Sequence, residues 1–196
     1  MGLSLVTAPT SEPLTLAEAA AHLRISDSPI PDADYVSALI TAARNYAEGD
    51  TRRAFVSQTW DYTLKEFPSW GLYLPIQPVQ SVTYVQYVKP DGTTASFIDT
   101  SVSPNTAKFD VVTDGPRAYL IPKYGLEWPE TRDHGQAVTV RFVAGYSTVP
   151  EDLKHALKML IADWYEGREA SSVGQAVTQV PFAVDAILSG YRMRGF

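Results

Sequence analysis

The sequence lacks cysteine, long apolar runs and clusters of basic residues. Because none of its 196 residues is cysteine, disulfide scaffolds, thiol nucleophiles, zinc ribbons and iron–sulfur clusters are excluded. No stretch approaches the roughly 18 apolar residues of a transmembrane helix. The opening segment, Met1 to Val6, has no basic region of the kind that begins a secretory signal. We therefore expect a cytoplasmic product that is not associated with a membrane.

Positive charge is scarce. The chain has 16 basic and 22 acidic residues, for a formal charge of −6. Arg52-Arg53 is the only basic doublet and closely follows Glu48 and Asp50. Because a nucleic-acid surface needs clustered Lys and Arg to displace counterions from phosphates, we expect no specific binding of DNA or RNA.

Motifs for catalysis are also missing. The sequence has no P-loop, no dinucleotide-binding glycine pattern and no Gly-x-Ser-x-Gly nucleophile turn. None of the three histidines, His22, His134 and His155, has a second histidine four residues away. We therefore expect no catalytic residue, no metal site and no cofactor.

Two alternative functions start from weaker patterns. Glycosidases need two carboxyl groups at a defined separation, and the middle of the chain offers both acids and aromatic residues, so a carboxylate-pair glycan hydrolase is one alternative. Its candidates are Asp61, Glu66, Asp99, Asp110, Asp114, Glu127 and Glu130, with Trp70, Tyr73 and Trp128 nearby. The first two helices also suggest a helix-turn-helix, but their connection from Ser26 to Ala33 is longer than the usual turn.

Hydrophobic periodicity divides the chain into helical ends and a β-rich middle. Apolar residues recur at helical spacing over residues 15–25, 34–50, a stretch of about twenty residues from Val149, and 182–190. Alternation and β-branched residues between these ends predict strands at 59–64, 82–88, 109–113, 118–121 and 137–143. We predict an α+β fold: a small helical bundle from 1–56 and 147–196, with an inserted antiparallel β-sandwich or barrel-like domain at 57–146. The first eleven residues are expected to form an arm.

The C-terminal segment has the composition of a binding surface. Aromatic residues, arginine and methionine are enriched in interface cores. The segment combines all three in Tyr191, Arg192, Met193, Arg194 and Phe196. It is too short to pack on itself, so we expect it to dock on a partner.

Several ordered strings resemble the adaptor, or head-tail connector, proteins of tailed phages, prophages and gene transfer agents. Residues 14–24 read Leu-Thr-Leu-Ala-Glu-Ala-Ala-Ala-His-Leu-Arg, and residues 39–46 read Leu-Ile-Thr-Ala-Ala-Arg-Asn-Tyr. The similar strings that follow are Glu48, Thr51, Arg53, Gln58-Thr59, Leu74 to Val79, Asp91-Gly92, Ala144-Gly145-Tyr146, Val149-Pro150, Trp164-Tyr165-Glu166 and Arg168. The resemblance covers most of the chain and fits the larger members with a β-rich insertion, but no family pattern aligns with residues 171–180.

The resemblance implies a structural role without enzymatic activity. It implies a subunit of a ring, expected to be dodecameric, that joins the capsid portal to the tail in the virion and forms part of the DNA channel. The implied partners are the portal protein, a tail-terminator or stopper-type tail protein and other copies of the chain, while DNA passes without specific binding. The residues carried over as portal-binding are Tyr191, Arg192, Met193, Arg194 and Phe196. Another virion or tail-completion protein is the closest alternative.

Overall fold

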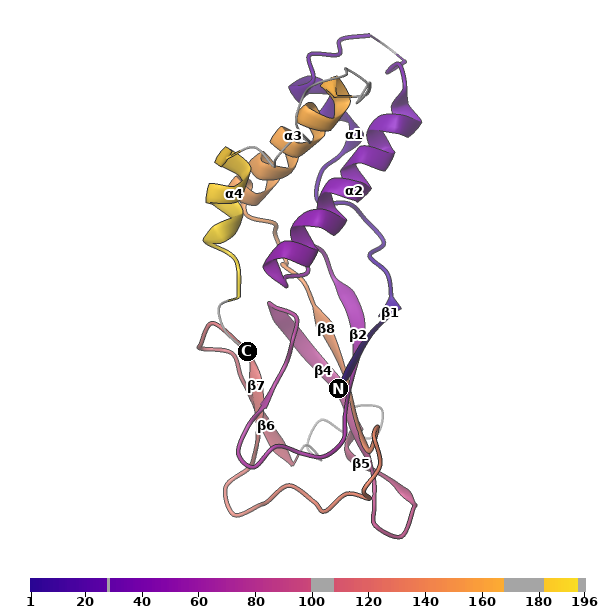
Figure 1. Cartoon of the computed structure of the whole chain (residues 1–196), viewed down its shortest axis with the longest axis vertical. Helices are drawn as coiled ribbons and strands as arrows, with labels where there is room; N and C mark the ends of the chain where they lie inside the picture. The colour runs from indigo at the N-terminus through magenta and orange to yellow at the C-terminus, as the bar shows by residue number, and fades with distance from the viewer. Residues whose placement is uncertain (28, 100–107, 168–181, 194–196) are drawn as a thin grey trace, which may run out of the picture. The chain divides into compact units, whose positions relative to one another are not determined.

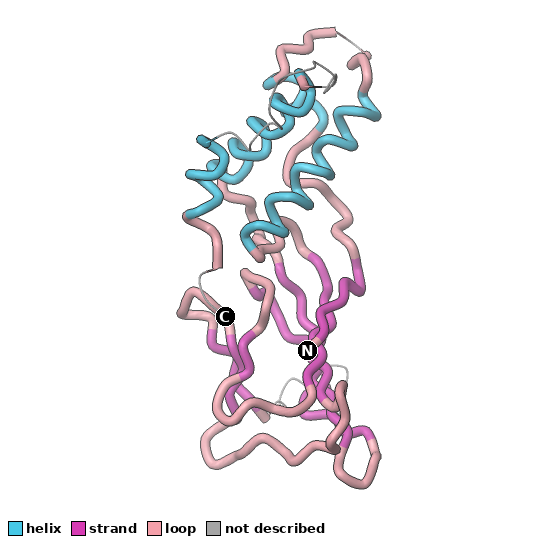
Figure 2. The backbone as a smooth tube through the Cα atoms, viewed as in Figure 1, coloured by secondary structure: helices cyan, strands magenta, loops and turns pink. Residues whose placement is uncertain are grey.

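The computed structural model describes residues 1–27, 29–99, 108–167 and 182–193. Helices and antiparallel strands segregate along the chain, which confirms the α+β class (Figure 1, Figure 2). The elements are β1 (Gly2–Thr7), α1 (Leu16–His22), α2 (Ala33–Thr51), β2 (Gln58–Leu64), β3 (Leu72–Tyr73), β4 (Val79–Val88), β5 (Thr94–Asp99), β6 (Phe109–Val112), β7 (Tyr119–Pro122), β8 (Val138–Ala144), α3 (Glu151–Glu166) and α4 (Phe182–Ser189).

The chain forms two compact units. A β unit comprises Met1–Pro9 and Ser57–Tyr146, and a helical unit comprises Thr10–Val56 and Ser147–Phe196. The helical unit therefore combines helices from both ends of the chain, with the β-rich stretch between them in the sequence.

The β unit contains two antiparallel sheets. One has the strand order β1-β2-β8-β4-β5, and the other has the order β3-β7-β6. Side chains of β8 alternate between buried and half-buried, as expected for a central strand. Phe142 is fully buried and lies opposite Trp60 of β2 and Val82 of β4. Both sheets have open edges, so the barrel-like part of the prediction is not realised.

The N-terminal residues differ most from the prediction. Instead of forming an arm, Gly2–Thr7 pairs with β2 as the edge strand of the larger sheet. Pairing across this distance depends on the exposed edge of β2, a tertiary feature that has no local pattern in residues 1–11.

The helical unit is held together by small and aliphatic side chains. α2 buries Val36, Leu39, Ile40, Ala43 and Ala47, which recur at helical spacing. α3 buries a matching set, and α3 packs on α2 and α4 while α1 packs on both α2 and α3. Tyr35 and Tyr46 lie at the margin of this apolar stripe, with exposed fractions of 36% and 38%. There they contact Tyr165 and Trp164 of α3.

A capping box begins α1, where Thr15 and Glu18 stand three residues apart in the sequence. The Thr15 hydroxyl accepts from the Glu18 amide at 3.2 Å, and Glu18 Oε2 accepts from the Thr15 amide at 2.8 Å. The backbone and side-chain hydrogen bonds from Thr15 lower the pKa of Glu18 below its ordinary value. The ionised form of Glu18 therefore stabilises the start of α1.

Replacing Thr15 with alanine is expected to lower the stability of the helical unit by about 1 kcal/mol at neutral pH. A carboxyl group with a depressed folded-state pKa stabilises the fold above its unfolded pKa, and that stability is lost as pH falls through the folded pKa. The T15A variant should therefore lose less stability than the wild type on acidification below the ordinary Glu18 pKa of 4.5. Urea unfolding across this range measures both effects, and parallel pH profiles for the two proteins would contradict the assignment.

Candidate functional site

The predicted docking segment begins where α4 ends. The amides of Tyr191 and Arg192 donate to the carbonyl of Leu188 at 2.9 and 3.1 Å, which closes the last turn of the helix. The Gly190 amide donates to Ile187 O at 3.2 Å. These bonds aim the segment toward the C-terminal end of α2 and the N-terminal end of α3.

Tyr191 is held by residues at the ends of both of those helices. Its hydroxyl donates to the carboxylate of Asp152, at 2.6 Å from the nearer oxygen. Its carbonyl accepts from Arg53 Nε at 2.8 Å, and the Arg53 guanidinium lies 5.9 Å from the centre of the tyrosine ring. Tyr191 is therefore fixed at both its backbone and its ring.

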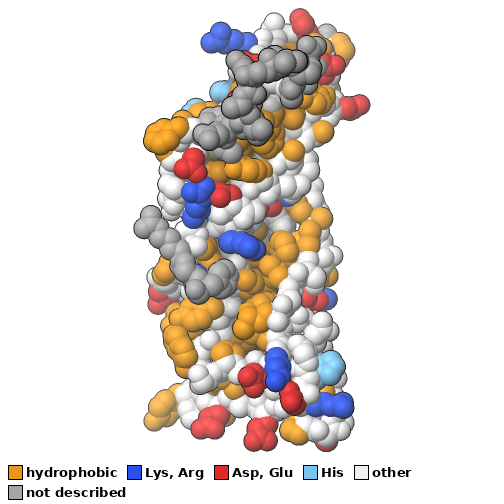
Figure 3. Space-filling model, in the orientation of Figure 1, with side chains coloured by type: hydrophobic (Ala, Val, Ile, Leu, Met, Phe, Trp, Pro, Cys, Tyr) orange, Lys and Arg blue, Asp and Glu red, His pale blue; other side chains and the backbone are white. Residues whose placement is uncertain are grey.

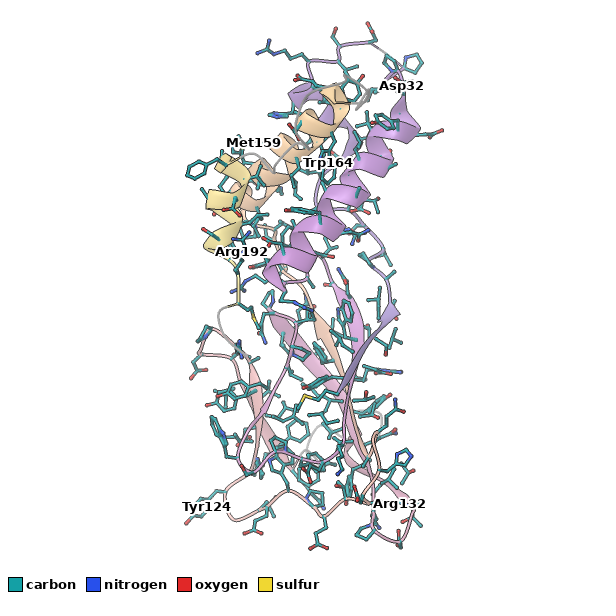
Figure 4. All side chains as sticks on the ribbon, in the orientation of Figure 1. Asp32, Tyr124, Arg132, Met159, Trp164 and Arg192 are labelled. Carbon is teal, nitrogen blue, oxygen red and sulfur yellow. The ribbon has the colours of Figure 1, made fainter. Side chains whose placement is uncertain are left out.

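Arg192 links two further acids. Its Nε lies 2.9 Å from Asp50 Oδ2 of α2, and its Nη2 lies 2.6 Å from Asp185 Oδ1 of α4. The side-chain hydrogen bonds of Asp50 and Asp185 raise the pKa of Arg192 above its ordinary value. Figure 4 shows Arg192 at the point where the chain leaves α4. The guanidinium thus joins the C-terminal end of α2, where cations are favoured, to Asp185 in the first turn of α4.

The five predicted docking residues therefore fall into two groups. Tyr191, Arg192 and Met193 bind to the chain's own helical unit, where the Met193 amide donates to Thr51 O at 3.3 Å. Arg194 and Phe196 lie outside the described residues. The sequence did not indicate the anchoring side chains Asp50, Arg53, Asp152 and Asp185, because they come from separate segments of the chain and form no local motif.

Arg44, a basic residue on the second helix of the helix-turn-helix alternative, is buried. It is 6% exposed and its Nε lies 2.7 Å from Glu12, while its Nη1 lies 3.1 Å from Glu48. Burial lowers the pKa of Arg44, but the hydrogen bonds and charges of Glu12 and Glu48 outweigh that effect and leave it raised. An arginine enclosed in this way contacts no phosphate backbone, which disfavours nucleic-acid binding by α2.

Of the seven acids considered for a glycan hydrolase, four do not line the groove described below and three do. Asp61 forms a two-point ion pair with Arg141 at 2.6 and 2.7 Å. Asp110 lies on β6, Asp114 in the turn after it, and Asp99 belongs to β5. Glu66, Glu127 and Glu130, however, line one groove of about 810 Å³ together with Trp70 and Trp128. The remaining candidate aromatic residue, Tyr73, packs against Trp70 with ring centres 5.5 Å apart.

Histidines and acids do not assemble into a metal centre within the described ranges. His22 and His155 approach each other edge to face, with ring centres 6.5 Å apart. No group of three or more His, Asp or Glu side chains there is placed to hold a metal ion. Over the same residues, no helix is both long and apolar enough to cross a membrane.

Comparison with known proteins gives a family match over the C-terminal part of the chain. Residues 132–192 match the family model of the phage gp6-like head-tail connector protein. This region includes β8, α3, α4 and the anchored residues Tyr191 and Arg192. No curated protein sequence matches the chain significantly.

Solved structures match over the full length. One is the neck of an empty gene transfer agent (GTA) particle with C6 symmetry, where the matching chain is 26% identical with a TM-score of 0.79. A second is the virion of a native GTA particle, at 25% identity and a TM-score of 0.77. A third is the neck of a native GTA particle with C12 symmetry, at 27% identity and a TM-score of 0.71. Each match covers 100% of this chain and 97% of the other. Over residues 132–192 the chain therefore matches the phage head-tail connector family, and over its full length it is similar to chains in the necks and virions of gene transfer agents.

Proposed function

We propose that the chain is a structural subunit of the ring that joins the portal of a phage-like particle to its tail. The observation that carries this proposal is the full-length likeness to a chain in the neck of a GTA particle with C12 symmetry. A dodecameric ring built from head-to-tail contacts follows from that likeness. Its location is the virion, at the connection between head and tail.

The charge of the chain suits a DNA channel. Twelve copies, each with a formal charge of −6, would carry about −72 in total, and a wall of this sign repels DNA. The enclosure of Arg44 removes one cation from the surface. DNA therefore passes without specific binding, and the chain has no catalytic role.

The portal is the proposed partner of the C-terminal segment. Tyr191, Arg192 and Met193 attach the start of this segment to the helical unit, because each is bonded to residues of α2, α3 or α4. Arg194 and Phe196 then supply an arginine and an aromatic ring, the residue types that are enriched in interface cores. A tail-terminator or stopper-type protein is the proposed partner on the opposite side of the ring.

Deleting residues 194–196 tests the docking segment. Binding of the full-length protein to its cognate portal should weaken at least about tenfold in the truncated protein, because the arginine and aromatic contacts are lost. The unfolding free energy of the helical unit should stay unchanged, since the anchors at Tyr191 and Arg192 remain. Cryo-electron microscopy of the mixture and a binding titration measure both the ring and its affinity.

Deleting residues 191–196 would be a less selective experiment, because it also removes the ion pairs of Arg192. A better single substitution is Arg194→Ala, with Arg132→Ala as its control at an exposed arginine of the β unit. Equal portal binding by R194A, R132A, the truncated protein and the wild type would refute the docking assignment. A ring that forms without the portal contact would leave the connector function standing.

A further inference from the structure

The groove in the β unit lies between two segments that contact each other through Trp128. One segment runs from Glu66 to Trp70 and the other from Leu126 to Thr131. Trp128 ties them together: its ring stacks on Phe67 with centres 4.6 Å apart and planes 6° apart, and its Nε1 donates to the carbonyl of Trp70 at 3.4 Å. The groove is therefore formed before any ligand arrives, which lowers the entropic cost of binding.

Trp70 is the exposed aromatic residue of this groove. It is supported by Tyr73 and Tyr119, with ring centres 5.5 and 5.7 Å away, yet 60% of it remains accessible to solvent. A tryptophan held in place but left open belongs to the residue types most enriched at binding hot spots. The ring offers a face for stacking at little further cost in side-chain entropy.

The side chains that line the groove carry negative charge, which favours a positively charged ligand. Glu66, Glu127 and Glu130 line it, and no Lys or Arg is among its lining residues. None of the three carboxylates forms an ion pair with another side chain in the described part of the sequence. In Figure 3, acidic side chains occur at the lower end of the molecule, with some Lys and Arg side chains beside them. Three negative charges beside an aromatic face, of which Glu66 also interacts electrostatically with Lys65, favour a cation over a neutral ligand.

The same unit already holds one arginine by this combination of groups. The Arg141 guanidinium pairs with both oxygens of Asp61 and lies 4.9 Å from the centre of the Tyr84 ring. The groove presents the carboxylates and the aromatic ring without an arginine from its own chain. Arginine suits it better than lysine, because a planar guanidinium stacks on an aromatic face and pairs with a carboxylate at two points.

We propose that this groove binds an extended, arginine-bearing segment of a partner protein. The interaction goes beyond the ring and portal contacts and uses none of the C-terminal residues. A failure of one proposal therefore leaves the other intact. The groove has a volume of about 810 Å³, which is within the range of ordinary ligand-binding sites.

The test uses the full-length protein and acetylated tetra-arginine amide as the probe, with tetra-lysine amide as its charge-matched counterpart. Calorimetric titration at low ionic strength should show tetra-arginine binding more tightly than tetra-lysine. The W70A variant should bind tetra-arginine about threefold more weakly, because a cation–π contact is lost. The E127Q/E130Q variant should bind about fivefold more weakly, because two exposed ion pairs are lost.

Two matched controls separate the groove from general attraction to an acidic protein. Y124A removes an aromatic residue that is fully exposed and does not line the groove. D110N/D114N removes two acids elsewhere in the β unit. Tetra-arginine binding that is absent, or that D110N/D114N weakens as much as E127Q/E130Q does, overturns the proposal. Trp70-dependent binding of chito- or malto-oligosaccharides, with no binding of tetra-arginine, overturns it in favour of a glycan site.

Discussion

Replacing Arg44 with methionine is expected to destabilise the helical unit by about 3 kcal/mol, since removing one partner of a buried ion pair leaves the other charge uncompensated. The side chain of Glu48 is only 14% exposed, and that of Glu12 is 30% exposed. Methionine keeps most of the aliphatic packing of Arg44, so the loss measures charge rather than volume. Urea unfolding followed by circular dichroism, with hydrogen exchange of α2 amides, measures the change.

A second substitution identifies the cause of that loss. In R44M/E48Q the buried negative charge is removed, while the amide oxygen introduced at position 48 can still accept the hydrogen bond that Phe55 N donates to Glu48 at 2.6 Å. The double variant should therefore be more stable than R44M. Lys65→Gln is the control at an exposed pair with Asp133, whose side chains are 62% and 86% exposed, and should change stability by less than about 1 kcal/mol. If R44M/E48Q is no more stable than R44M, the loss comes from packing.

The elements of the fold were predictable wherever local physics decides them. The capping box at Thr15 and Glu18, the apolar stripes of α2 and α3, and the alternation along β8 follow from short-range spacing, and the structure has them close to the predicted bounds. The Asp91-Gly92 turn is another case: Gly92 has a φ of +86°, and the Thr93 amide donates to Asp91 Oδ1 at 2.8 Å. Glycine adopts this φ without a steric penalty.

Features that depend on distant partners were not predictable. The edge strand β1 forms only because β2 offers it a ladder of backbone hydrogen bonds, and the two-residue strand β3 is too short for a periodic pattern. The order β1-β2-β8-β4-β5 likewise has no signal in single segments.

The candidate sites show the same division. Residue types alone marked Tyr191 and Arg192 as interface residues, but their attachment to Asp152, Asp50 and Asp185 required the packing of α2, α3 and α4. The acids Glu66, Glu127 and Glu130 were noticed one by one. Only the stacking of Trp128 on Phe67 and its hydrogen bond to Trp70 bring their segments together in one groove.

Replacing Phe142 with alanine should destabilise the β unit by about 4 kcal/mol, because the change removes a large side chain from a closely packed interior and leaves a cavity. Phe142 is fully buried on the central strand of the larger sheet. We propose that the two units also fold separately, in which case hydrogen exchange of β2 and β8 amides accelerates in F142A while α2 and α3 amides keep their protection.

Val143→Ala is the control on the same strand, since Val143 lies on the other face and is half-buried, and should cost about 1 kcal/mol. Equal loss of protection in both units would show that they unfold together, and the boundary at residues 57 and 146 would then mark a change of architecture within one cooperative structure.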